Sequence, residues 1–155
     1  GFLTGPVFAI FYTLAGMPLA LLADRTSRKQ VLVGGLLLWS LMTAAQGQVR
    51  LFWQLTTARL LVGVGEATCA PNSHAILSDY FPPERRATAL AIFSLGGHIG
   101  MLIGFAFGGY AAQTLGWRTA FVAVGLPGVL LAVLGAATLR EPLRVRSEST
   151  RLALQ

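Results

Sequence analysis

Long apolar stretches separated by short charged turns make up most of the chain. Each stretch is long enough to cross about 30 Å of hydrocarbon as an α-helix, and four of the five contain no charged side chain. The five predicted spans cover residues 1–23, 30–49, 51–80, 87–112 and 119–139. The pattern therefore predicts an all-α, polytopic membrane helix bundle with five transmembrane helices in residues 1–139, followed by a polar, basic linker at residues 140–155.

Composition supports a membrane protein. Of the 155 residues, 54% are hydrophobic and 12% are charged, and the mean hydropathy is +0.65. Soluble domains usually carry about 25% charged residues. The single cysteine, Cys69, lies inside an apolar span, so the sequence holds no disulfide framework.

Most basic residues fall on one side of the predicted bundle. Because successive spans alternate in direction, nine of the twelve Arg and Lys residues lie on one side, two on the other and Arg59 within a span. The nine are Arg25, Arg28, Lys29, Arg85, Arg86, Arg140, Arg144, Arg146 and Arg151, and the two are Arg50 and Arg118. This bias assigns the first group to the cytoplasm. Membrane topology thus accounts for the net charge of +6, and we expect no nucleic-acid partner.

The third predicted span carries two opposite charges, Arg59 and Glu66, in its middle. Seven residues return a helix to nearly the same face, about 10 Å further along its axis. A charge left alone near the bilayer centre costs about 2.5–3.5 kcal/mol. We therefore expect this face to point toward partner helices or a water-filled cavity, as in a transporter. A carboxylate in such a cavity can exchange protons as its surroundings change, although a purely structural Arg–Glu pair is the alternative.

Two histidines are candidates for the same cavity or for simple packing. His74 lies about 80° around the helix from Glu66, and we assign it to the cavity, with a packing role as the alternative. His98 is interpreted as a packing residue. The two lie on separate spans without a cysteine cluster, so we predict neither a metal site nor another cofactor.

The charged turn after the first span provides the first family signal. Its sequence, DRTSRK at residues 24–29, resembles the loop between helices two and three of the major facilitator superfamily. That pattern's charged positions are occupied by Asp24, Arg25, Arg28 and Lys29. Ala20 and Ser27 stand where the pattern has glycines, and the form with serine is similar to the Spinster-like branch.

The third span extends the resemblance. The run Arg59-x-x-x-Gly63-x-Gly65-Glu66-Ala67, followed by Pro71 and Asp79, is similar to helix four of that branch. The resemblance implies that Arg59 and Glu66 face the central cavity and act in proton coupling or substrate binding. We place Tyr12, from the first span, in the same cavity. The family resemblance also implies that Asp79 pairs with Arg28 in a cytoplasmic gate.

The fourth span contains a ladder of glycines at every fourth position: Gly96, Gly100, Gly104 and Gly108. This spacing allows another helix backbone to approach closely. The resemblance places this helix at the interface between the two halves of a transporter, with plain helix packing as the alternative. Phe105 stands where some antiporters of the superfamily have proline, so the motif does not favour antiport over symport.

Together these features resemble helices two to six of a twelve-helix secondary transporter, with helix one and the second half expected outside this sequence. Such transporters hold their substrate between two six-helix bundles, so we expect these 155 residues alone not to transport. The expected partners are a small organic or amphipathic solute, protons, the lipid bilayer and the second half. The expected location is the cell (inner) membrane. An uncoupled facilitative carrier and a non-transporting receptor or assembly subunit are alternatives. We find no catalytic nucleophile and no set of metal ligands in the sequence, so we do not expect an enzyme.

Overall fold

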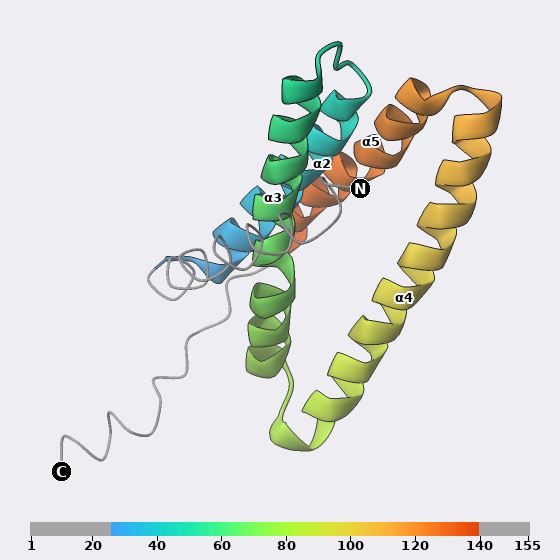
Figure 1. The fold of residues 1–155 in the computed structure, drawn as a ribbon. Helices are drawn as coiled ribbons and strands as arrows, with labels where there is room; N and C mark the ends of the chain where they lie inside the picture. The colour runs from blue at the N-terminus through green and yellow to red at the C-terminus, as the bar shows by residue number, and fades with distance from the viewer. Residues whose placement is uncertain (1–25, 140–155) are drawn as a thin grey trace.

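The computed structural model describes residues 26–139, and this region is built from α-helices joined by short turns (Figure 1). The helices are α2 (Arg28–Gln46), α3 (Phe52–Tyr80), α4 (Pro83–Thr114) and α5 (Trp117–Thr138). The all-α prediction is therefore correct for the described residues. The first predicted span, the linker, and Tyr12, Asp24 and Arg25 lie outside them, so the number of five helices stays a prediction.

Local side-chain and backbone chemistry sets the helix starts. The Ser27 hydroxyl caps α2 by accepting a hydrogen bond from the Gln30 N–H at 3.1 Å. At the start of α3, Gln54 Oε1 accepts from the backbone N–H groups of Arg50 and Leu51, at 2.9 and 3.1 Å. Helix α4 begins with Pro83, whose missing N–H is not needed in a first turn. Helix α5 follows Gly116, whose φ of 81° suits glycine.

Helices α2, α3 and α5 form a closely packed core, whereas α4 lies apart from α2 and diverges from α3 (Figure 1). The close packing depends on glycine. A Cβ atom on Gly65 of α3 would lie 2.5 Å from the Gly35 carbonyl oxygen and 2.8 Å from the Trp39 nitrogen of α2. On the other side of α2, a Cβ on Gly125 of α5 would lie 2.7 Å from the Ala44 nitrogen. The backbones of α3 and α5 therefore approach that of α2 directly.

Helices α4 and α5 are long and apolar enough to cross a membrane, judged by length and composition. Within the described residues, α4 leaves most of its apolar side chains uncovered, for example Leu102 at 71% and Phe105 at 76% exposure. Nothing described lies within 4 Å of a Cβ built on Gly96, Gly100 or Gly104, and Gly108 has only Val124 at 4.0 Å. The packing role of the glycine ladder thus stays a prediction. Close backbone neighbours are found instead at glycines outside the ladder, such as Gly35, Gly65 and Gly125.

Two proline residues lie inside helices, Pro71 in α3 and Pro127 in α5. Pro71 has no N–H to donate to the Ala67 carbonyl one turn earlier, which weakens the helix locally. Just beside it, the Asn72 side-chain amide donates to the Thr68 carbonyl at 2.7 Å. The Thr68 hydroxyl in turn donates to the Gly65 carbonyl at 2.7 Å. These buried polar groups are thus satisfied within α3.

We predict that Gly35→Ala destabilises the helix core, whereas Gly34→Ala does not. The new Cβ on Gly35 would collide with Thr68 Oγ1 and lie 2.9 Å from the Gly65 carbonyl oxygen, whereas at Gly34 nothing lies within 4 Å. Overpacking of this kind typically costs about 1–3 kcal/mol. Thermal unfolding of the two variants in detergent would measure the difference. Equal melting temperatures would contradict the close contact between α2 and α3.

Candidate solute cavity and cytoplasmic ion pair

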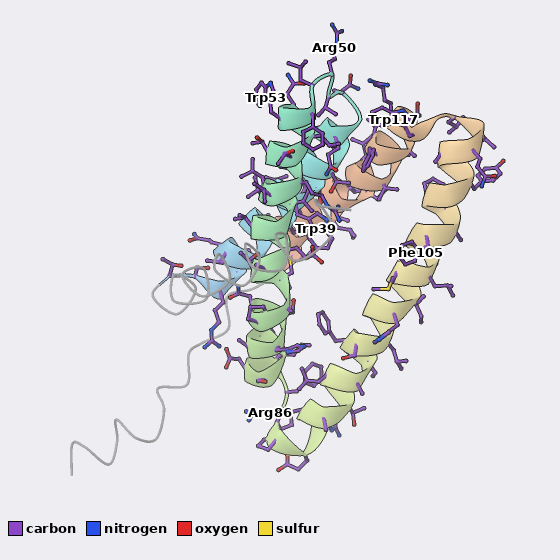
Figure 2. The ribbon with its side chains drawn as sticks, in the orientation of Figure 1. Trp39, Arg50, Trp53, Arg86, Phe105 and Trp117 are labelled. Atoms are coloured by element: carbon purple, nitrogen blue, oxygen red, sulfur yellow. The ribbon has the colours of Figure 1, made fainter. Side chains whose placement is uncertain are left out.

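A cavity of about 460 Å³ lies among α2, α3, α4 and α5. Arg59 and Glu66 both line it, so the structure brings the two charged residues in the middle of α3 to one wall. The other lining residues are Trp39, Thr43, Val62, Gly108, Ala112, Trp117, Ala120, Phe121 and Val124. Figure 2 shows Trp39 where α2, α3 and α5 cross in this view and Trp117 near the start of α5. The cavity therefore combines two charges, a hydroxyl and three aromatic rings.

The packing of α3 against α2 explains why the charges face this cavity. Gly65 and Thr68 are buried on the side of α3 that meets Gly35 of α2. Since each residue turns a helix by about 100°, Glu66, one residue after Gly65, points away from that packed side. Its side chain is exposed, and Arg59, one residue after buried Ala58, is half-buried. A volume of this size lies within the usual range of about 300–1,000 Å³ for sites that bind small molecules.

Trp117 and Phe121, at the start of α5, form part of the cavity wall, and Arg118 packs against the Trp117 ring. The rings of Trp117 and Phe121 meet edge to face, with their centroids 6.3 Å apart. The Arg118 guanidinium carbon lies 4.1 Å from the centre of the Trp117 ring, a cation–π contact. Arg118 Nη2 also donates to the Val49 carbonyl at 3.3 Å. This links the start of α5 to the turn between α2 and α3.

The aromatic wall was missed by sequence reasoning. The sequence pattern assigns none of Trp39, Trp117 and Phe121 to the cavity. One signal was available for Trp39, because tryptophan in membrane helices concentrates at the interfaces. A tryptophan in the middle of a charge-free span is therefore a candidate for a site inside the bundle.

An ion pair joins the beginning of α2 to the end of α3. Arg28 Nη1 donates to Asp79 Oδ2 at 2.6 Å, and the two side chains keep 24% and 23% of their surface exposed. The pairing of Asp79 with Arg28 that the family resemblance implied is therefore present. Lys29 lies beside Arg28 in the first turn of α2. Asp24 and Arg25, the other members of the expected gate, are outside the described residues.

The histidines lie apart from the charged cavity. His74 is exposed and does not line the cavity, and its ring meets that of Phe93 edge to face with centroids 5.4 Å apart. His98 Nδ1 lies 2.7 Å from the Ser94 carbonyl oxygen on its own helix. Between residues 26 and 139, no three His, Cys, Asp or Glu side chains gather in a way that could hold a metal ion.

Comparison with known proteins identifies the family. Residues 3–154 match the profile of the Major Facilitator Superfamily. The chain belongs to this superfamily. Its relatives are transporters rather than enzymes, and membership in the superfamily implies an integral membrane protein that crosses the bilayer several times.

Individual relatives place the chain in the Spinster-like branch of the superfamily. It is 39% identical over 134 residues to an MFS-type efflux pump of Mycolicibacterium smegmatis, covering 86% of this chain and 31% of that protein. It is 33% identical over 142 residues to human protein spinster homolog 1, covering 89% and 27%. A crystal structure of a bacterial homologue of the human lysosomal transporter Spinster, inward-facing and unoccupied, has a TM-score of 0.75 and 38% identity, covering 92% and 35%. The chain thus spans about a third of the length of these proteins.

We predict a small but measurable coupling between Arg28 and Asp79. Partly exposed ion pairs contribute about 0.2–1 kcal/mol, so a double-mutant cycle of Arg28→Ala and Asp79→Ala should give a coupling energy in that range. Unfolding of the purified protein in detergent supplies the four stabilities. A cycle of Arg50→Ala with Asp79→Ala is the control, because Arg50 lies in the turn at the opposite end of α3. Strict additivity in the first cycle would show that the pair contributes nothing to stability.

Proposed function

We propose that this chain forms helices two to six of a twelve-helix secondary transporter that moves a small organic or amphipathic solute by alternating access. Proton exchange at Glu66 would couple solute movement to a proton gradient. The observation that carries the proposal is that Arg59 and Glu66 line one cavity together with Trp39, Trp117 and Phe121. Charged side chains in the middle of a membrane span carry a high free-energy cost unless they face a water-filled cavity. The volume of this cavity suits a small solute.

The two charged residues would have different roles. Glu66 can bind and release a proton, and its exposed position on the cavity wall gives both water and solute access to it. Arg59 keeps its charge under all physiological conditions, so it suits an anionic group of the solute or the ionised form of Glu66. A proton on Glu66 would remove the negative charge from the cavity wall and leave the positive charge of Arg59 to attract the solute, which is one physical route to coupling.

The aromatic wall supports a solute with an apolar part. Trp39, Trp117 and Phe121 offer flat apolar surfaces, while Arg59 and Glu66 offer charge at the same cavity. Relatives of the chain include a probable galactarate/D-glucarate transporter of Bacillus subtilis, 31% identical, and a probable sphingolipid transporter of Arabidopsis thaliana, 30% identical. Both names denote solutes with polar groups, and the second adds a long apolar chain. We favour the amphipathic class because of the three rings.

The ion pair between Arg28 and Asp79 would hold one arrangement of the cytoplasmic end. It joins α2 to α3 at the end that carries the basic side chains of the predicted cytoplasmic face. In this proposal Asp24, Arg25 and Lys29 complete the gate, and the protein lies in the cell (inner) membrane. Opening toward the cytoplasm would break or re-form these contacts, whose modest strength suits a reversible switch.

We predict that Glu66→Gln in the full-length transporter abolishes transport driven by a pH gradient and leaves the protein folded. The amide keeps the size and the hydrogen-bonding capacity of the side chain, but it cannot gain or lose a proton at physiological pH. The measurement is solute uptake into proteoliposomes with an imposed pH gradient, for solutes found to bind the wild-type protein. Glu84→Gln is the matched control, because Glu84 is exposed in the first turn of α4 and does not line the cavity.

Exchange of labelled for unlabelled solute without a pH gradient separates coupling from binding. The proposal expects Glu66→Gln to retain this exchange while losing gradient-driven uptake. Uptake that depends on pH as in the wild type would remove Glu66 from the mechanism. Wild-type transport that ignores the gradient altogether would identify an uncoupled facilitative carrier.

A further inference from the structure

Arg118 makes three contacts at the junction between the start of α5 and the turn that joins α2 to α3. Its guanidinium carbon lies 4.1 Å from the centre of the Trp117 ring, and its Nη2 donates to the Val49 carbonyl at 3.3 Å. Its carbonyl oxygen packs so closely on Gly47 that a Cβ built on this glycine would collide with that oxygen. The side chain and the backbone of Arg118 therefore both hold the first turn of α5 against the end of α2.

The end of α2 favours a positive charge at this position. The last turn of α2 contains no basic residue of its own, and the negative end of a helix dipole attracts cations. Arg118 brings the cation from another helix, 69 residues away in sequence from the carbonyl that it contacts. The hydrogen bond to Val49 directs one edge of the guanidinium, which limits the ways in which the guanidinium can cover the Trp117 ring.

The part of the Trp117 ring that Arg118 covers is directed away from the candidate solute cavity. Trp117 lines this cavity, whereas Arg118 does not. The edge-to-face contact with Phe121, a second residue of the cavity wall, restricts the ring from the side. Trp117 keeps 46% of its surface exposed, so part of the ring is left uncovered for contact with a solute.

We propose that Arg118 is a positioning residue of the candidate solute cavity. It holds the Trp117 ring in one orientation, so that the uncovered part of the ring forms a fixed apolar surface for the solute. A side chain that is already fixed loses little conformational freedom on binding, and a fixed ring therefore binds an apolar group better than a mobile ring. The role in solute binding rests on the proposed function, whereas the orientation of the ring does not depend on any solute.

Fluorine NMR of the full-length transporter labelled with fluorotryptophan tests the orientation of the ring without a solute. The resonance that disappears in Trp117→Phe belongs to Trp117. Arg118→Gln should shift and broaden this resonance, because the ring can then adopt several orientations. Arg118→Lys should restore most of the wild-type signal, since an ammonium group can also lie over the ring.

Arg50→Gln is the matched control for the fluorine spectrum. It removes the same charge from the turn between α2 and α3, where Figure 2 shows Arg50 at the tip and pointing away from the helices. This variant should leave the Trp117 resonance unchanged. A Trp117 resonance that is also unchanged in Arg118→Gln would overturn the proposal.

Binding of phenylbutyrate, an anion with an apolar ring, tests the consequence for a solute. Arg118→Gln should weaken its binding to the transporter in nanodiscs about two- to fivefold, an effect of the size of one cation–π contact at a partly exposed site. This effect should vanish in a Trp117→Leu background, because Arg118 acts through the ring. D-glucarate, an anion without an apolar part, should bind equally to the wild type and to Arg118→Gln.

Two outcomes separate this proposal from the proposed function. An equal loss of phenylbutyrate binding with and without the Trp117 ring would show that Arg118 acts through its own charge, and would overturn its positioning role. Failure of the folded wild type to bind either anion would contradict the proposed site for an anionic solute. The fluorine spectrum alone would then decide whether Arg118 positions the ring. Size-exclusion chromatography confirms that each variant is folded.

Discussion

Direct backbone contact between α2 and α3 determines which way α3 faces. Gly65 packs against the Gly35 carbonyl and the backbone of Trp39, at distances that leave no room for a side chain on Gly65. Once this contact fixes the rotation of α3, the position of every other residue on the helix follows from its 100° step. Glu66 must then turn out of the interface, and Arg59, two helical turns earlier, shares its wall. The candidate cavity thus depends on Gly35 and Gly65, which have no functional side chain of their own.

The same rotation also positions the end of α3. Asp79 reaches Arg28 at the start of α2, close to where the chain reverses into α4. The two charged sites differ in kind. The pair of Arg28 and Asp79 joins two helices and is partly exposed to water, so its strength is modest and easily reversed. Arg59 and Glu66 lie on one helix and line a cavity with aromatic rings, where the proposed proton exchange and solute binding would alter the balance of charge.

Much of this arrangement could be predicted from local sequence. The helical class and the positions of the turns follow from the spacing of charged residues between apolar runs, because few other structures satisfy backbone groups in lipid. The common face of Arg59 and Glu66 follows from helix geometry alone. The partnership of Arg28 with Asp79 came from family resemblance, since no local rule links residues so far apart in sequence.

The remaining features depend on contacts between distant segments. The ladder from Gly96 to Gly108 has the spacing that predicts a helix interface, yet the close backbone contacts among the described residues involve other glycines, Gly35, Gly47, Gly65 and Gly125. Their role depends on which residues face them, and sequence spacing does not contain that information. Trp39 and Phe121 are similar, because they line one cavity only when α2 and α5 pack against each other.

Pro71 lies between the two charged sites on α3, five residues after Glu66 and eight before Asp79. The helix lacks a backbone hydrogen bond at this point, so it is a natural pivot. In the proposed transporter, the segment that holds Asp79 would move about Pro71 while the segment that holds Glu66 stays packed against α2 at Gly65. The proposed cytoplasmic gate would then open and close without any rearrangement of the candidate cavity.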